Sequence, residues 1–220
     1  MAVKNGERFI AEALDSVVSQ EPAPEEIIVI DGDSSDRSAE IAARYPSVRV
    51  IRQRGTGFCG AWNEGIAEAR GELIAILDSD DRWLPGKHAA QLELLAAQPE
   101  LDYAVTRMRF FLDPGAAVPA GFRPELLDGD HEANMPSALL IRRRAFERVG
   151  GFEESFGVAS DIDWFARAKD VPLRLGRVER VLVEKRVHDA NLSMSAATEY
   201  NRELLRSLRE TVARKRVSGE

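Results

Sequence analysis

Short apolar runs alternate with amphipathic stretches through the first half of the chain. The runs at residues 27–30, 48–51 and 73–77 are bounded by Gly, Pro or charged residues, as buried strands are. Apolar residues recur at helical spacing between these runs, which predicts helices over 7–20, 36–45, 60–70 and 85–98. This alternation predicts an α/β fold with three layers and a mostly parallel central sheet.

The second half of the chain is less regular. Residues 113–135 are rich in Pro, Gly and Asp, and we expect them to form a long surface loop. Amphipathic patterns predict helices over 162–169 and 199–216. Apolar, β-branched and aromatic residues predict strands over 103–112, 137–141 and 177–187.

The chain enters its first predicted helix almost at once. Asn5-Gly6-Glu7 already leads into that helix, so only Ala2 and Val3 remain to supply a strand ahead of it. A parallel α/β sheet of this type should have a strand of about five or six residues there. We therefore expect the first strand to be largely missing, and the sequence to start several residues late. An empty slot would expose strand edges and apolar helix faces.

Composition narrows the function classes. The chain has 220 residues, enough for one domain with a sizeable core. A net charge of −7 argues against a nucleic-acid partner, which would require a basic face. The single cysteine, Cys59, rules out an internal disulfide, and we expect it to be a packing residue. No apolar run is long enough to cross a bilayer, so we expect a cytoplasmic protein, with peripheral association at the inner face of the membrane as an alternative.

Carboxylates gather where two of the predicted strands end. Asp31 directly follows the first apolar run, and Asp78, Asp80 and Asp81 directly follow the third. Ligands of an open parallel sheet bind outside the carboxyl ends of its strands, so both groups of acids should face one crevice. A lone carboxylate there can accept hydrogen bonds from a ribose or a base. An Asp-x-Asp pair can hold a divalent cation and leave positions open for a diphosphate.

The same acids have a purely structural interpretation, because Asp and Ser are common in turns and helix caps. We favour that interpretation for Asp33, Ser34 and Ser35. We favour ligand binding for Asp78 and Asp80, because neighbouring carboxylates repel one another and a plain turn would not require them.

Several stretches resemble family 2 glycosyltransferases with the GT-A fold. NGERFIAEALDSVVSQ, EEIIVIDGDSSD and GAWNEGIAEARGELIAILDSDDRWLPGK resemble the family's nucleotide-binding half, and VGGFEESF, SDIDWFARA and KRVHDANLS resemble its acceptor half. The resemblance implies a nucleotide-sugar-binding half at 1–112, an acceptor-binding and catalytic half at 113–195, and a C-terminal helix at 196–220.

The implied reaction moves a sugar, with inversion, from a nucleoside diphosphate sugar to a hydroxyl acceptor. The acceptor would be a saccharide, a lipid-linked molecule or another hydroxyl compound, and the cofactor Mg²⁺ or Mn²⁺. The family also implies a role in cell-envelope or exopolysaccharide synthesis. By position, Asp31 would contact the nucleobase and Asp78 the ribose or the surroundings of the metal. Val3 and Asn63 would be further donor contacts.

The resemblance places the metal and the catalytic base as well. Asp80 would bind the metal that bridges the diphosphate, and His188 would complete the metal site as it does in some members. Asp161 stands where the family has its base, with Asp163 as the reserve. Displacement at an anomeric carbon needs both a proton acceptor and a stabilised leaving group, so these roles are chemically consistent.

Other interpretations remain open at the level of the sequence. Asp161 and Asp163 could be first-turn acids that favour the helix N-terminus, and His188 could be a hydrogen-bonded residue at a strand end. The protein could be a non-catalytic sugar-nucleotide-binding protein. A sugar nucleotidyltransferase should carry a Gly-rich, basic phosphate loop after its first strand, and this sequence shows none.

Overall fold

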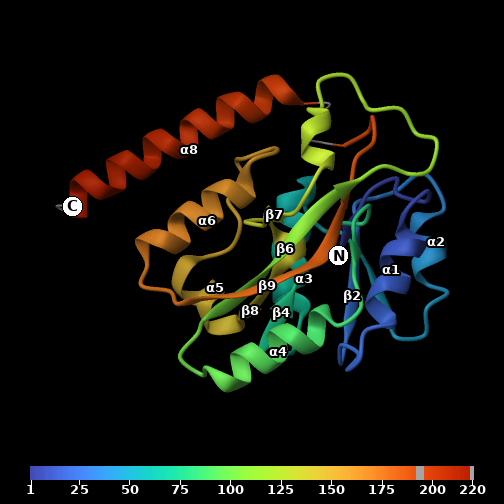
Figure 1. The fold of residues 1–220 in the computed structure, drawn as a ribbon, viewed down its shortest axis with the longest axis horizontal. Helices are drawn as coiled ribbons and strands as arrows, with labels where there is room; N and C mark the ends of the chain where they lie inside the picture. The colour runs from blue at the N-terminus through green and yellow to red at the C-terminus, as the bar shows by residue number, and fades with distance from the viewer. Residues whose placement is uncertain (192–195, 219–220) are drawn as a thin grey trace.

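The computed structural model describes residues 1–191 and 196–218 (Figure 1). The strands are β1 (Ala2–Val3), β2 (Ile27–Asp31), β3 (Val48–Arg52), β4 (Leu73–Ala75), β5 (Arg82–Trp83), β6 (Tyr103–Phe111), β7 (His131–Glu132), β8 (Leu139–Arg142) and β9 (Leu175–Arg186). The helices are α1 (Ile10–Val18), α2 (Ser38–Ala42), α3 (Gly57–Glu68), α4 (Lys87–Ala97), α5 (Arg143–Val149), α6 (Ser160–Asp170) and α8 (Ala197–Ser218), with short 3-10 helices η1 (Pro124–Leu127) and η2 (Pro136–Ala138).

Strands β1, β2 and β3 form a parallel sheet in the order β1-β2-β3. The side chains of β2 alternate between two apolar clusters. Ile27 and Val29 pack with residues of α1, whereas Ile28 and Ile30 pack with Ala61 of α3. Because helices cover both faces, every residue of β2 is buried, which explains its continuous apolar run.

The first strand lies in the middle of the fold and is very short. β1 pairs with β2 on one side, and on the other Ala2 forms a parallel bridge to Asp78, just beyond β4. The expected strand ahead of the first helix is therefore present, and it lies beside β2. Its pairing extends over its two residues only.

The second sheet has the order β4-β8-β6-β9-β5, with β7 at the side of β6. Only β6 and β9 pair in parallel; β4–β8, β6–β8, β5–β9 and β6–β7 are antiparallel. The expectation of a mostly parallel central sheet therefore holds for β1-β2-β3, and the bridge just beyond β4 is also parallel to β1, whereas the antiparallel pairs belong to the second sheet. An apolar run predicts that a strand is buried, but it does not fix which strand pairs with it.

Local backbone geometry changed several predicted boundaries. α4 begins at Lys87 instead of 85, because Gly86 before it adopts a left-handed conformation with φ of 82°. The predicted loop at 113–135 contains η1 and the short strand β7, and neither β5 nor α5 was predicted.

The C-terminal helix α8 packs against α6 along the outside of the domain (Figure 1). Within residues 1–191 and 196–218, every helix is too short or too polar to cross a membrane.

A lysine is buried at the start of α4. Lys87 is 1% exposed, and its Nζ donates a hydrogen bond to the neutral Oε1 of Gln91 at 2.8 Å. The ammonium also lies 4.0 Å from the ring centre of Trp83. Burial lowers the pKa of Lys87 to about 7, because the charged form loses its hydration.

We expect Lys87 to make the stability of the protein pH-dependent. The unfolded lysine keeps its proton up to its ordinary pKa of about 10.4, whereas the folded one loses it near pH 7. The unfolded state therefore binds more protons between these values, so the free energy of unfolding rises with pH. In urea denaturation, the free energy of unfolding of the wild type minus that of Lys87→Met should increase by about 1 kcal/mol per pH unit from pH 7 to 9. A difference that stays constant with pH would contradict this.

Candidate active site

Three carboxylates meet just beyond the end of β4. Asp78, Asp80 and Asp81 each offer an oxygen, and these oxygens lie within 4.8 Å of one another. β1 separates this acidic cluster from the end of β2, since Ala2 bridges to Asp78 and Val3 pairs with Asp31. Both groups of strand-end acids therefore face the same edge of the fold, as the sequence predicted.

Asp80 faces the segment that follows β9. Its Oδ2 lies 3.0 Å from Nε2 of His188 and accepts a hydrogen bond from Nδ2 of Asn191 at 3.2 Å. Burial alone would raise the pKa of Asp80, but the contact with His188 and the positive charge of Lys185 outweigh it, and the pKa is lowered. Asp80 is therefore held as a carboxylate, the form that binds a cation.

His188 is well placed to be a second ligand. Its ring stacks at a tilt on Phe9, with centroids 4.6 Å apart, and its Nδ1 is buried with no partner among the described residues. A carboxylate oxygen and an imidazole nitrogen 3.0 Å apart can face one cation. Leu192 and Ser193, which belong to the quoted KRVHDANLS stretch, lie outside the described residues.

Asp81 has a structural position in the acidic cluster. It is 1% exposed, and it accepts hydrogen bonds from Oγ of Ser137 at 2.9 Å and from the backbone N–H of Arg186 at 3.1 Å. Burial, together with the charges of Asp80 and Asp78, raises the pKa of Asp81 to about 7. Asp81 therefore ties the end of β4 to η2 and β9.

Lys185, which was not predicted as a site residue, supplies positive charge to this cluster. Its Nζ lies 3.7 Å from Asp81 Oδ2 and 3.9 Å from Asp78 Oδ2. Burial would lower its pKa, but the surrounding carboxylates, led by Asp81, raise it. A basic residue just after the apolar run 181–183 of β9, three positions before His188, was the available signal.

Asp78 lies between the lysine and the open side of the cluster. Its side chain is 25% exposed. Burial raises its pKa to about 6; the charges of Asp80 and Asp161 act in the same direction, and that of Lys185 opposes them. Since Asp78 sits beside β1 with part of its carboxylate accessible, it can accept hydrogen bonds from a bound ligand.

Asp31 carries a buried oxygen with no partner. The residue is 7% exposed, and its Oδ2 accepts the backbone N–H of Ser34 at 3.2 Å. Its Oδ1 is buried and has no hydrogen-bond partner among the described residues. A buried acceptor left unpaired is costly unless a ligand or water pairs it, so Asp31 is a candidate ligand contact.

The loop after β2 is shaped by hydrogen bonds to the segment after β1. Asn5 N–H donates to Oγ of Ser34 at 2.9 Å, and the side chain of Asn5 accepts from Ser35 N–H at 2.8 Å. Asp33 is exposed and pairs with Arg52 at 2.8 Å. These contacts confirm the turn interpretation of Asp33, Ser34 and Ser35.

The amide of Asn63, a predicted donor contact, holds another part of the protein. Its Nδ2 donates to Phe152 O at 2.8 Å and to Glu154 at 3.1 Å, and its Oδ1 accepts Phe152 N–H at 2.8 Å. Both N–H groups of the amide are thereby used. Asn63 fixes α3 to the loop after α5, and its contact with a donor stays a prediction.

The two acids of α6 have different surroundings. Asp163 is 2% exposed and pairs with Nε of Arg167 at 2.7 Å, one turn along the helix. Asp161 is only partly buried, and its charge acts on Lys185, Asp78 and, from α8, Tyr200. Burial raises the pKa of Asp161. Of the two acids, Asp161 is the one beside the acidic cluster.

Cys59 is a packing residue, as expected. It is 3% exposed, and its thiol donates toward Phe156 O at 3.1 Å and Ser160 Oγ at 3.0 Å. Burial raises its pKa to about 11, so the thiol carries no charge at neutral pH.

Two solved structures have the same fold as this chain. Residues 1–349 of S. aureus TarS, in complex with UDP-GlcNAc, match with a TM-score of 0.71 and 20% identity, over 89% of this chain and 59% of that one. The mannosyltransferase PcManGT from Pyrobaculum calidifontis, in complex with GDP-Man and Mn²⁺, matches with a TM-score of 0.70 and 18% identity, over 96% of this chain and 62% of that one. The α/β fold of this chain is therefore the GT-A fold, which confirms the predicted class.

Sequence comparison identifies the family. The model of glycosyl transferase family 2 matches residues 1–154. An uncharacterized glycosyltransferase of Rickettsia typhi is 30% identical over 214 residues, which cover 88% of this chain and 64% of that protein. The chain belongs to glycosyl transferase family 2, and it spans less than two thirds of the length of each of these relatives.

Proposed function

We propose that this protein transfers a glycosyl group from a nucleoside diphosphate sugar to a hydroxyl acceptor, with inversion and with a divalent cation, Mg²⁺ or Mn²⁺. One observation carries the proposal: the unpartnered oxygen of Asp31 and the Asp80–His188 pair lie on either side of β1, at the edge where strands end. The complexes of the two structural relatives, one with UDP-GlcNAc and one with GDP-Man and Mn²⁺, support it.

The donor would lie across the ends of β2, β1 and β4. Asp31 Oδ1 would accept an N–H of the base, and Asp78 would accept a ribose hydroxyl, with the backbone of Val3 between them. Asp80 and His188 would hold the cation. When bound, the cation supplies positive charge to the departing diphosphate. In this arrangement residues 1–112 bind the donor and residues 113–195 contribute the acceptor side, flanked by the helix of 196–220.

Asp161 would act as the base. As the acceptor oxygen forms its bond to the anomeric carbon, the bond from that carbon to the diphosphate oxygen breaks. The hydroxyl proton then passes to the carboxylate of Asp161. One displacement inverts the anomeric carbon and needs no nucleophile from the protein. Partial burial raises the pKa of Asp161, which makes its carboxylate a better proton acceptor.

The acceptor would be a saccharide, a lipid-linked molecule or another hydroxyl compound, handled at the cytoplasmic side of the membrane during synthesis of envelope or exported polysaccharide. Membership of family 2 favours this function over that of a sugar nucleotidyltransferase. A non-catalytic sugar-nucleotide-binding protein would share the donor contacts, and it would bind a donor without turning it over.

A thermal-shift panel tests the proposal. We expect one nucleoside diphosphate sugar, offered with Mn²⁺ or Mg²⁺, to raise the melting temperature by about 5 to 10 °C at 100 times its Kd. The shift should shrink when EDTA replaces the cation, because the diphosphate then loses its partner. Release of nucleoside diphosphate with a hydroxyl acceptor would establish transfer. Equal shifts with and without cation would contradict metal-dependent donor binding.

A further inference from the structure

A glutamate of the last helix binds the backbone just ahead of α6. Glu203 of α8 is 5% exposed, and its carboxylate accepts three successive backbone N–H groups, those of Gly157, Val158 and Ala159. The bonds to Val158 and Ala159 measure 2.8 and 2.9 Å. Successive N–H groups of this kind form a concave site for an anion. Here a side chain more than 40 positions along the chain fills that site.

Glu203 takes the place of a local cap for α6. Ala159 stands at the N-cap position of this helix, and it makes no side-chain cap bond. The N–H groups at the start of a helix need acceptors, which Ser, Thr, Asp or Asn at the N-cap usually supply. The carboxylate of Glu203 also places negative charge near the positive end of the helix dipole. The start of α6 is therefore fixed from α8.

Asp161, the proposed base, directly follows this anchored segment. It is the second residue of α6, and its Oδ1 accepts the backbone N–H of Ile162 at 2.8 Å. The carboxylate is thereby tied to the first turn and moves with it. Its charge acts on Lys185 and Asp78 in the acidic cluster. The place of Asp161 beside that cluster therefore depends on where the start of α6 is held.

Polar contacts hold α8 against the domain. Glu203 is buried, whereas Leu205 and Leu208 of the same helix are both 53% exposed. In the part of the chain that the structure describes, the buried apolar clusters include no residue of α8. Arg214 adds an ion pair to Asp170 at the end of α6, at 2.7 Å. Apolar burial therefore contributes little to this packing, and the bonds of Glu203 are a main part of it.

The segment bound by Glu203 is held from the other side by α3. The thiol of Cys59 donates toward Phe156 O at 3.1 Å and Ser160 Oγ at 3.0 Å. Residues 156–160 thus lie between α3 and α8. Cys59 is the single cysteine of the chain and is buried. Its reactivity toward a thiol reagent therefore reports whether this segment has loosened.

We propose that Glu203 is a positioning residue, which binds the backbone ahead of α6 and so keeps Asp161 beside the acidic cluster in the orientation that transfer requires. This inference rests on the proposed function, because it acts through the base assigned there. The match to the family model ends at residue 154, so the bound segment and α8 both follow the matched part.

Glu203→Gln tests this role with little change in shape. Both carboxylate oxygens accept N–H groups, whereas an amide has one oxygen and turns N–H donors toward the remaining site. We expect the rate of transfer to fall by about 10- to 100-fold, while the Kd of the donor stays within about twofold. The rate is followed as nucleoside diphosphate released from the sugar nucleotide that gives the largest thermal shift. Labelling of Cys59 should be about tenfold faster or more.

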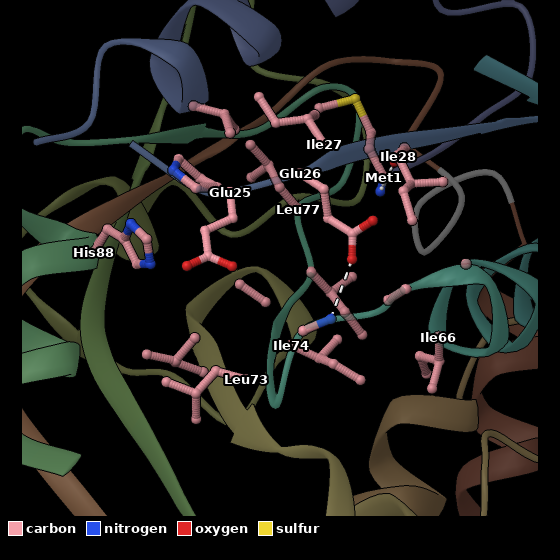
Figure 2. A pocket seen from close by; sticks show the side chains of 18 of the residues that line it. Met1, Glu25, Glu26, Ile27, Ile28, Ile66, Leu73, Ile74, Leu77 and His88 are labelled. Carbon is pink, nitrogen blue, oxygen red and sulfur yellow. Dashed lines mark hydrogen bonds between the residues drawn. The ribbon is translucent and has the colours of Figure 1, made fainter. Parts of the chain in front are cut away.

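Glu26→Gln is the matched control. Glu26 borders a cavity of about 810 Å³ between β2 and β4, and its carboxylate accepts the backbone N–H groups of Arg70 and Gly71 (Figure 2). Glu26 precedes β2, whereas Asp31 ends that strand, so the two lie at opposite ends of it. The control removes a similar charge-assisted contact away from α6. Its rate of transfer and its Cys59 labelling should stay within about twofold of the wild type.

Gly157→Ala disturbs the same contact and keeps the charge of Glu203. A Cβ at Gly157 would lie 3.3 Å from Oε1 of Glu203, so the carboxylate must shift. This variant should also speed Cys59 labelling, and it should lower the rate of transfer by about threefold or more. It decides the question if Glu203→Gln does not fold. Wild-type labelling and a wild-type rate in Gly157→Ala would then overturn the proposal.

A double-mutant cycle with Asp161→Asn separates positioning from a general loss of structure. If Glu203 acts through Asp161, Glu203→Gln should lower the residual rate of Asp161→Asn by less than about twofold. A further loss of about tenfold or more in the double variant would overturn the proposal. So would a Glu203→Gln variant that transfers at the wild-type rate, or one whose donor Kd rises as much as its rate falls. A wild type that binds donor without turnover would instead refute the proposed function, and Cys59 labelling would still show whether Glu203 holds the segment.

Discussion

Asp80→Asn is expected to weaken Mn²⁺-dependent donor binding by about 100-fold or more. This effect is comparable to the loss of metal affinity that substitutions at metal sites cause. Asp80 combines a strand-end position with a carboxylate that is held ionised beside His188. Asparagine keeps the shape and can still contact His188 and Asn191, but it carries no charge to attract the cation. Calorimetry with the donor found in the panel, at fixed Mn²⁺, measures the change.

Asp33→Asn is the matched control for this substitution. Asp33 is also the second acid of an Asp-x-Asp after a strand, but its side chain is 74% exposed and pairs with Arg52. The Asp33→Asn variant should bind the donor with a Kd within about twofold of that of the wild type, because surface ion pairs contribute little to stability. The metal assignment of Asp80 fails if its asparagine variant binds donor as tightly as Asp33→Asn while both melt at the wild-type temperature.

Asp161→Asn is expected to lower the rate of transfer by about 100- to 10,000-fold and to leave donor affinity within about twofold. The substitution removes the proton acceptor and leaves Asp80 and His188 in place. In the wild type the rate should rise with pH through the pKa of Asp161, since only the carboxylate accepts a proton. Burial places that pKa above the usual range of an aspartate. Released nucleoside diphosphate, followed from pH 4 to 8, measures both effects.

Asp163→Asn separates this role from that of the neighbouring acid. Asp163 is buried against Arg167, so its substitution should lower the melting temperature. It should have little effect on the rate of the transfer step. Transfer per folded molecule should remain close to that of the wild type. If instead Asp163→Asn folds normally and loses transfer while Asp161→Asn stays active, the base lies two residues along the helix.

Local pattern was enough to predict the elements that surround the site. The run at 27–30 is apolar throughout because helices cover both faces of β2, and that property can be read from neighbouring residues alone. The placement of acids after strands likewise predicted one edge that carries both Asp31 and Asp80. The resemblance to family 2 glycosyltransferases rested on these same stretches, and the family model confirms it.

The antiparallel partner of β4 could not be predicted from its own residues. Residues 73–77 have the same pattern as residues 27–30, yet β4 pairs antiparallel with β8. Residue patterning records how deeply a strand is buried, and it contains no information on which distant strand lies beside it.

The composition of the site was also decided by long-range packing. Asp80 meets His188 and Asn191 more than 100 positions away, and Lys185 enters the acidic cluster from β9. Asp161 and Asp163 are equivalent in sequence as first-turn acids. Residues two apart on a helix point in nearly opposite directions, so only one of them can face the cluster.

The sequence by itself determined the α/β class, the buried strands and the acids that end them, because each follows from the chemistry of adjacent residues. Only the tertiary structure decided that Asp161 lies beside the acidic cluster, that Lys185 neutralises part of that cluster, and that Asn63 holds a loop. These outcomes depend on contacts between segments far apart in the chain, which are set by how whole elements pack.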